Sequence, residues 1–479
     1  MVERRTFIAG AAAAGTLAAV GGAVYSAAAD PDEASPKTDR VLNATAITQV
    51  FGDGQKLVAV AVEYDRAIDT ASLSTSTFDV TDRKVTKVYA NTRAALAEKG
   101  RDGRYVIVEL SPDDTAAALW VTQQGSGTGP SGSAGVSSSK SSTSGASSAS
   151  SPSASASSSG GGGVGEGGPK VGDSTPGGTI VAAKATLTQK GTVTTADGTR
   201  YAADSTTLTT SKVINLIVDD FKQLSYHDPA TGQTLKYNLF VPKGYDPGKS
   251  YPLVLFMHDA SVVNVATEGP LVQGLGAVCW ASDADQARHE SFVLAPEYGS
   301  VVVDDTYKPS PLFDATANLV KAVTKKYSID SKRLYATGQS MGAMMTVGLN
   351  IKYPDLFAAS FVVAGQWPSG QAKPLAEKKL WIVVSQDDDK SYSGENAITK
   401  VIKAEGTKVG TAVWDGQSTS AQFAADVRSL EKQKAPVNYA SFQAGTTVKS
   451  GSGTSAHMGT WHIAYTIPGI RDWIMRQSG

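Results

Sequence analysis

One short stretch, residues 333–345, constrains the fold of this chain more than any other. It places an apolar run, 334–337, directly before the pattern Gly338-Gln-Ser340-Met-Gly342, and a helix-forming segment directly after it. In a nucleophile elbow a serine occupies a sharp turn between a strand and a helix, and small neighbours avoid collision with the adjacent backbone. The pattern alone is weak in a chain with 48 glycines. The flanking strand and helix therefore carry the prediction that Ser340 is a nucleophile.

Length and composition bound the other options. At 479 residues the chain exceeds one ordinary core, so two domains plus unstructured sequence are expected. A net charge of -1 without a long basic run argues against nucleic acid or an anionic membrane surface as the partner. The single cysteine, Cys279, excludes an internal disulfide, and its apolar setting predicts a buried structural thiol.

The first residues resemble a twin-arginine export signal. Arg4 and Arg5 precede an Ala/Gly-rich apolar run that ends near Val24, and small residues follow up to Ala29. We expect cleavage after Ala29, so that 1–29 is a signal peptide and the mature protein is secreted, with no stable membrane insertion. The alternative is a membrane anchor of about 18 residues, near the lower limit for spanning a bilayer.

Residues 41–217 have the pattern of a β-sandwich domain. Short alternating runs predict strands at 44–51, 56–64, 77–80, 85–90 and 104–110. Residues 125–178 are almost wholly Ser, Gly, Ala, Thr and Pro, which predicts disorder because few apolar side chains are available to offset ordering entropy. The β-type sequence returns after 179, with strands expected at 180–190, 191–195 and 200–203. We interpret the tract as a loop inserted into this domain, and a plain interdomain linker is the alternative.

Residues 218–479 alternate strands with helices, which predicts a largely parallel sheet covered on both faces. The strands are expected at 235–241, 251–257, 334–337, 358–363, 380–384 and 437–442, and the helices at 312–327, 341–353 and 468–477. This is the α/β-hydrolase pattern. In that fold the nucleophile is followed along the chain by an acid after a late strand and then by a histidine.

The acid should come from three consecutive aspartates. Strand 380–384 runs into Asp387, Asp388 and Asp389, where the fold requires a carboxylate. We place Asp388 first and Asp389 second. A solvated acidic loop and a cation site are the alternatives.

Two histidines follow the acid. His457 lies in a segment of small residues, predicted to be a loop that reaches a neighbouring strand end, and His462 begins the next segment. We therefore choose His457 as the base that activates the serine, and expect His462 to be packed or solvent-facing.

An oxyanion hole needs two backbone N–H groups aimed at the developing charge. The residue after the nucleophile, Met341, supplies one. The other should come from Asp259 or Ala260, after strand 251–257. His258 is expected to be structural.

Several segments resemble a known family. They are Val218–Phe221, Tyr237–Tyr245, Leu255–Ala260, Phe292–Tyr298 with Trp280, Arg333–Gly342, Ala364–Trp367, and His457 with Trp461. The family is that of secreted α/β-hydrolase carboxylesterases with an N-terminal immunoglobulin-like domain, related more distantly to polyhydroxyalkanoate depolymerases and feruloyl esterases. Some relatives are labelled predicted peptidases.

The resemblance implies an α/β-hydrolase fold preceded by a small all-β immunoglobulin-like sandwich, and a triad of Ser340, Asp388 and His457. It implies hydrolysis of carboxylic esters through an acyl-enzyme, without cofactor or metal. Two departures from the family pattern are Asp387, where a small residue is usual, and Asp259, where glycine is usual.

Two further questions stay open at this point. Trp280 and Trp367 could line the substrate cleft or belong to the core. A serine peptidase and a non-catalytic surface-binding protein are the alternative functions, and the intact order of serine, acid and histidine weighs against the second.

Overall fold

A computed structural model of the chain describes residues 40–122, 176–448 and 454–479. The predicted signal peptide, 1–29, and nearly all of the predicted disordered tract, 125–178, lie outside the described residues. Within those residues, no helix combines the length and the hydropathy needed to cross a bilayer.

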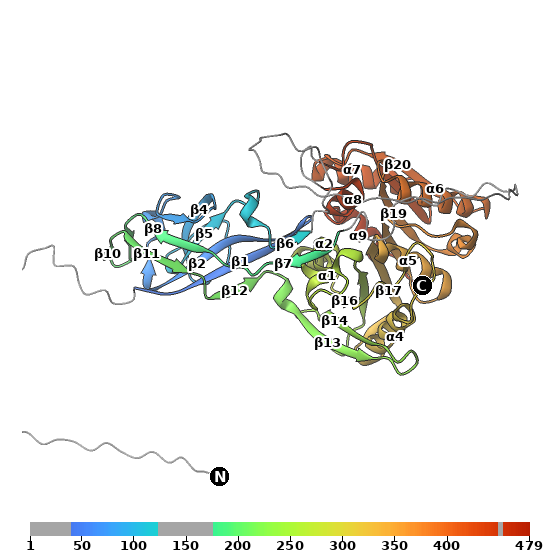
Figure 1. The fold of residues 1–479 in the computed structure, drawn as a ribbon, viewed down its shortest axis with the longest axis horizontal. Helices are drawn as coiled ribbons and strands as arrows, with labels where there is room; N and C mark the ends of the chain where they lie inside the picture. Colours follow the sequence, from blue (N-terminus) through green and yellow to red (C-terminus); the bar gives the residue numbers. More distant parts are fainter. Residues whose placement is uncertain (1–39, 123–175, 449–453) are drawn as a thin grey trace, which may run out of the picture. The chain divides into compact units, whose positions relative to one another are not determined.

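The N-terminal domain is built mainly from two β-sheets (Figure 1), and two short two-stranded sheets, β6-β7 (Trp120–Thr122 and Gly178–Ile180) and β9-β10 (Val193–Thr194 and Arg200–Tyr201), add to them. The larger of the two main sheets has the strand order β12-β1-β2-β5-β4, and the smaller has the order β11-β8-β3. Their bounds are β1 Val41–Phe51, β2 Gly54–Ile68, β3 Phe78–Val80, β4 Val85–Asn91, β5 Gly103–Leu110, β8 Thr186–Gln189, β11 Asp204–Thr209 and β12 Lys212–Asn215. Inward-facing residues such as Val60, Val108 and Leu187 form one buried cluster. The domain is therefore a sandwich with its core between the sheets.

Strands from both sides of the undescribed tract pair with each other. β12 runs parallel to β1, β8 pairs with β3, and β7 (Gly178–Ile180) pairs with β6 (Trp120–Thr122). The sequence predicted one strand over 180–190, but the chain leaves β7 after Ile180 and enters the other sheet at Thr186. β11 was not predicted because its Ser and Thr side chains are mostly exposed and show no apolar alternation.

The C-terminal domain contains a nine-stranded sheet in the order β13-β14-β16-β15-β17-β18-β19-β21-β20. β14 is antiparallel to both neighbours, and the other pairs are parallel. Their bounds are β13 Phe221–His227, β14 Thr234–Phe240, β15 Tyr251–Met257, β16 Phe292–Glu297, β17 Ile329–Gln339, β18 Ala359–Val363, β19 Leu380–Ser385, β20 Val409–Trp414 and β21 Val437–Phe442.

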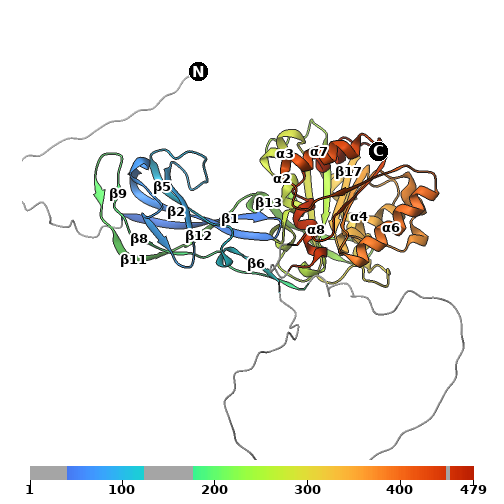
Figure 2. The ribbon, with the colours of Figure 1, turned by 90° about the horizontal axis from the view of Figure 1, so that it is seen from above.

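Helices cover both faces of this sheet (Figure 2). One face packs on α4 (Pro311–Lys326), α5 (Met341–Lys352) and α6 (Asp389–Ala404). The other packs on α1 (Gly269–Val272), α2 (Leu275–Ala281), α7 (Ser420–Glu431), α8 (Ala456–Ala464) and α9 (Pro468–Met475). The sequence of β15 is apolar throughout because both of its faces are buried. Leu253 and Leu255 pack in one core, and Val254 and Phe256 pack in the other.

The two domains meet through close backbone contacts. The turn between β1 and β2 reaches the C-terminal domain at Gly52, where a Cβ would lie 2.1 Å from the His462 carbonyl oxygen. A Cβ on Gly274 would in turn lie 2.9 Å from the Gly52 carbonyl oxygen. Val50 and Trp120 of the N-terminal domain join the core that lies under α2, α7 and α9. The described residues from Val41 onward accordingly form one compact unit.

Candidate active site

Ser340 lies in a strained turn between β17 and α5. Its backbone has φ +52° and ψ −117°, a conformation that costs a residue with a side chain roughly 1–3 kcal/mol. β17 ends at Gln339 and α5 begins at Met341. The Met341 N–H belongs to the first helical turn, which has no intrahelical partner and is free to bind charge. The turn therefore has the form of a nucleophile elbow.

The two elbow glycines are required by close backbone packing. A Cβ on Gly342 would lie 1.9 Å from the Met257 carbonyl oxygen, and a Cβ on Gly338 would lie 2.4 Å from the Gly342 backbone. Any side chain at either position would push α5 away from β15. The contact also brings the loop after Met257 beside the turn that carries Ser340.

Ser340, His457 and Asp388 form a hydrogen-bonded line. The His457 Nε2 lies 2.8 Å from the Ser340 Oγ, and the His457 Nδ1 lies 2.5 Å from the Asp388 Oδ2. All three residues are at most 9% exposed. With a proton on Nδ1, the imidazole donates to Asp388, and its Nε2 can accept the serine proton.

Of the three consecutive aspartates, Asp388 is the one that contacts the histidine. It is the N-cap of α6, and its Oδ1 accepts a hydrogen bond from the Ser391 N–H at 3.2 Å. Burial disfavours the ionised carboxylate and by itself would raise the pKa of Asp388. The hydrogen bonds from His457 and Ser391 favour the ionised form more strongly, so the pKa of Asp388 is held below its usual range. Asp387 and Asp389 are exposed, and Asp387 accepts from the Gly445 N–H.

His457 is the second residue of α8, so the prediction that it lies in a loop is wrong. Ser455 caps the helix by accepting from the Met458 N–H, and this cap outweighs the small residues that suggested a loop. The Trp461 ring packs edge-on against the imidazole, with centroids 5.0 Å apart. His462 lies on the same helix, outside the hydrogen-bonded line.

Ser391 is a supporting residue that the sequence reasoning missed. Its hydroxyl donates to the Ala364 carbonyl at 3.2 Å and lies 3.4 Å from the His457 Nδ1. It is 1% exposed. It lies three residues after Asp388, the N-cap of α6, at the position whose backbone N–H an N-cap side chain accepts from, and that spacing could have pointed to it.

The loop after β15 is built around Asp259. The Asp259 carboxylate accepts from the Ser261 N–H at 2.8 Å and from the Gln339 Nε2 at 2.7 Å. These bonds tie the loop to the residue before Ser340 and give the aspartate a structural function where glycine was expected. The amides of Asp259 and Ala260 stay the candidates for the second oxyanion donor.

His258 is held inside the protein. Its Nδ1 lies 2.7 Å from the Asp259 carbonyl oxygen, and its Nε2 accepts from the Tyr298 N–H at 3.1 Å. Both nitrogens are therefore used, and burial lowers the pKa of His258 to about 4. The geometry is that of a neutral structural residue.

Neither tryptophan singled out from the sequence lines the pocket described below. Trp280 is 1% exposed in α2 and donates to the Gly276 carbonyl oxygen. Trp367 packs against Tyr307 and bonds Gln371. Both lie in core clusters, which favours the core alternative that the sequence left open.

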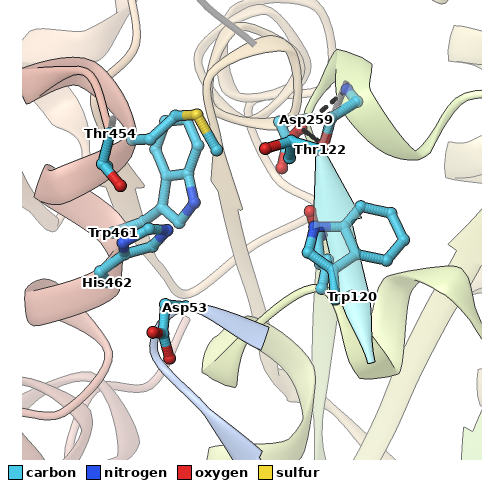
Figure 3. A pocket seen from close by; sticks show the side chains of 10 residues that line it. Asp53, Trp120, Thr122, Asp259, Thr454, Trp461 and His462 are labelled. Carbon is cyan, nitrogen blue, oxygen red and sulfur yellow. Dashed lines mark hydrogen bonds between the residues drawn. The ribbon is translucent and has the colours of Figure 1, made fainter. Parts of the chain in front are cut away.

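A pocket of about 160 Å³ instead lies between Trp120 and Trp461 (Figure 3). Its wall includes Asp259 and Ser261, from the loop after β15. The sequence reasoning missed it, because Trp120 comes from the N-terminal domain and Trp461 from α8, and no spacing in the sequence connects them.

The described residues hold no cluster of three His, Cys, Asp or Glu side chains arranged to bind a metal ion. Cys279 is buried, and burial raises the pKa of its thiol to about 12. At neutral pH it is therefore a thiol and a poor nucleophile.

Taken together, the fold and the site define the class: an α/β-hydrolase fold preceded by an immunoglobulin-like sandwich, with a serine at the elbow. Residues 43–202 match the family model for the esterase Ig-like N-terminal domain. The fold class and the family resemblance predicted from the sequence are thereby confirmed.

Similar proteins with known names support the same class. A solved structure described as a thermostable esterase aligns with a TM-score of 0.70 at 24% identity, covering 92% of this chain and 100% of its own. A probable acetylxylan esterase A of Aspergillus flavus is 48% identical over 97 residues, or 17% of this chain and 32% of that protein. Acetylxylan esterase A of Emericella nidulans is 32% identical over 97 residues. The chain thus spans about a third of the length of the curated relatives it matches.

Proposed function

We propose that this protein is a serine hydrolase that cleaves carboxylic esters. The observation that carries the proposal is the unbroken line from the Ser340 Oγ through the His457 imidazole to the Asp388 carboxylate, with separations of 2.8 and 2.5 Å. The names of the similar proteins, which are esterases, support the ester as the substrate class.

In this mechanism the Ser340 Oγ attacks the ester carbonyl carbon while the His457 Nε2 takes its proton. The charge on the carbonyl oxygen is stabilised by the Met341 N–H and by an amide of Asp259 or Ala260. His457 then protonates the leaving alcohol, and Asp388 holds the imidazole in the required tautomer. Water, deprotonated by His457, hydrolyses the acyl-enzyme and restores Ser340.

The test is the hydrolysis of a chromogenic short-chain ester by the wild type and by Ser340→Ala. We expect the variant to lose at least ~10³-fold in kcat, because the nucleophile is gone. Ser369→Ala is the matched control, since Ser369 lies in the 3-10 helix Ser369–Gln371 outside the site. Equal rates for wild type and Ser340→Ala would refute the hydrolase proposal. Faster cleavage of peptides than of esters would replace it by a peptidase.

Export by the twin-arginine route, expected from Arg4 and Arg5, belongs to the same proposal. It would place the enzyme outside the cytoplasm. Proteins exported by this route cross the membrane already folded, and a chain with a single cysteine can fold before export because it forms no internal disulfide.

A further inference from the structure

The pocket between Trp120 and Trp461 is built by both domains. Asp53, Trp120 and Thr122 come from the N-terminal sandwich, and Gln273 and His462 come from the catalytic domain. At about 160 Å³ it is smaller than the roughly 300–1,000 Å³ of pockets that take drug-sized ligands. One small ring is the size of ligand that it can hold.

The two indole rings lie on opposite sides of this space (Figure 3). Indole presents a broad apolar face and carries one N–H donor. Trp120 is 6% exposed and Trp461 3% exposed, so packing holds both rings in place. Such rigid faces suit the C–H surface of a saturated ring.

The rest of the lining is polar. Asp53, Asp259 and the hydroxyl groups of Thr122 and Ser261 supply oxygen atoms. Gln273 is 4% exposed, and its Nε2 donor has no hydrogen-bond partner among the described residues. A buried amide group without a partner is unfavourable, and a ligand hydroxyl could accept a hydrogen bond from it.

The charges of the lining disfavour an anion. Two carboxylates face the space, and Lys56 pairs with Asp53 at 2.9 Å. Burial lowers the pKa of His462 to about 4, so this histidine is neutral at pH 7. The described lining contains no lysine or arginine. A neutral ligand with several hydroxyl groups matches these conditions.

The pocket shares its walls with the residues around Ser340. Asp259 is bonded to Gln339, the residue before the serine, at 2.7 Å. On the other side, Trp461 packs against His457. A group bound in the pocket is therefore separated from the site of reaction by a single layer of side chains.

We infer that this pocket is a subsite for a neutral, hydroxyl-rich ring, such as a pyranose, in the alcohol part of the ester. The inference rests on the proposed function. It assigns the N-terminal sandwich a direct part in substrate selection, through Trp120 and Thr122.

The test compares two acetate esters whose alcohols contain six-membered rings: an acetylated methyl glucopyranoside and cyclohexylmethyl acetate, which lacks the hydroxyl groups. Trp120→Ala removes one apolar face, and Thr122→Val removes one hydroxyl with little change of shape. Val121→Ala is the matched control, because Val121 lies between these residues on β6 and is 45% exposed, outside the pocket lining.

We expect Trp120→Ala to raise KM for the sugar ester at least tenfold, and Thr122→Val to raise it about fivefold, the loss of one hydrogen bond of ~1 kcal/mol. For cyclohexylmethyl acetate, Trp120→Ala should also raise KM, because this ring presents the same kind of C–H surface, whereas Thr122→Val should stay within about twofold of wild type. Val121→Ala should change KM for neither ester. Thr122→Val keeps the test open if Trp120→Ala does not fold.

Equal effects of Thr122→Val on the two esters, or no effect of Trp120→Ala on the sugar ester, would overturn the subsite. Failure of the esterase proposal would be seen separately, because Ser340→Ala would then hydrolyse the chromogenic ester at the wild-type rate.

Discussion

Glu395 is a buried acid that the proposed reaction does not use. It is 0% exposed in α6, and neither carboxyl oxygen has a hydrogen-bond partner among the described residues. Burial and then the nearby charge of Asp388 raise the pKa of Glu395 from 4.5 to about 8. In the folded protein at neutral pH it is therefore mostly a neutral carboxylic acid.

This shift makes stability depend on pH. Between 4.5 and about 8 the unfolded chain has lost the Glu395 proton while the folded chain keeps it, so the stability falls as pH rises through this window. The slope from this group approaches about 1.4 kcal/mol per pH unit. Glu395→Gln keeps the shape and cannot ionise, so its melting temperature relative to wild type should rise between pH 5 and pH 8. A difference that is the same at both pH values would contradict the assignment.

The acid of the triad can be tested by three matched variants. Asp388→Asn keeps the cap on α6, because asparagine also accepts at the N-cap, but it removes the charge and favours the wrong imidazole tautomer. We expect kcat to fall by roughly 10⁴-fold. Asp387→Asn and Asp389→Asn, whose side chains are exposed, should stay within a few-fold of wild type. A normal rate in Asp388→Asn would move the acid to a neighbour.

At the scale of elements, the register of α5 against β15 depends on Gly342. Its Cα lies so close to β15 that an alanine methyl would lie 1.9 Å from the Met257 carbonyl oxygen. Overpacking of this kind typically costs about 1–3 kcal/mol. Gly342→Ala should therefore lower the melting temperature and reduce ester hydrolysis at least tenfold, since the helix carries the Met341 amide.

Gly370→Ala is the control for this variant, because nothing lies within 4 Å of a Cβ at that position. If Gly342→Ala kept both its stability and its rate, the close packing of the elbow on β15 would not be needed.

Elements with a strong apolar signal in their sequence were predictable, and elements with a weak apolar signal were not. Strands 251–257 and 437–442 were predicted with their observed bounds, because both are fully buried and their sequences are mostly apolar. β20 lies at the edge of the sheet with Val413 60% exposed, so its sequence carries little apolar signal. Helix α8 was predicted as a loop because its glycine and threonine residues have low helix propensity, which tertiary packing overrides.

At the scale of the whole molecule, the contact between the domains depends on Gly52. A methyl group there would lie 2.1 Å from the His462 carbonyl oxygen, on the helix that also carries His457. We expect Gly52→Ala to lower the melting temperature by a few degrees, at roughly 2–4 °C per kcal/mol, and to raise KM for the sugar ester. Gly177→Ala, where nothing lies within 4 Å, is the control. An unchanged melting temperature and KM would show that the two domains act independently.

The sequence by itself determined the fold class, the nucleophile candidate and the order of serine, acid and histidine. These follow from local patterns: strand and helix periodicity, small residues around a sharp turn, and a carboxylate at the end of an apolar strand. Each of these depends on residues close together in the chain, so it can be recognised without knowing the fold.

The tertiary structure showed that Asp388, which the family resemblance had favoured, contacts the histidine 69 positions later. Periodicity and spacing alone do not separate it from its two neighbours, because a one-residue step changes which side chain faces the histidine. Only the tertiary structure decided that Trp120 and Trp461 share a pocket while Trp280 and Trp367 are buried in the core. The physical reason is the same in both cases. Direction and burial of a side chain depend on contacts between residues far apart in the chain, and no local pattern encodes them.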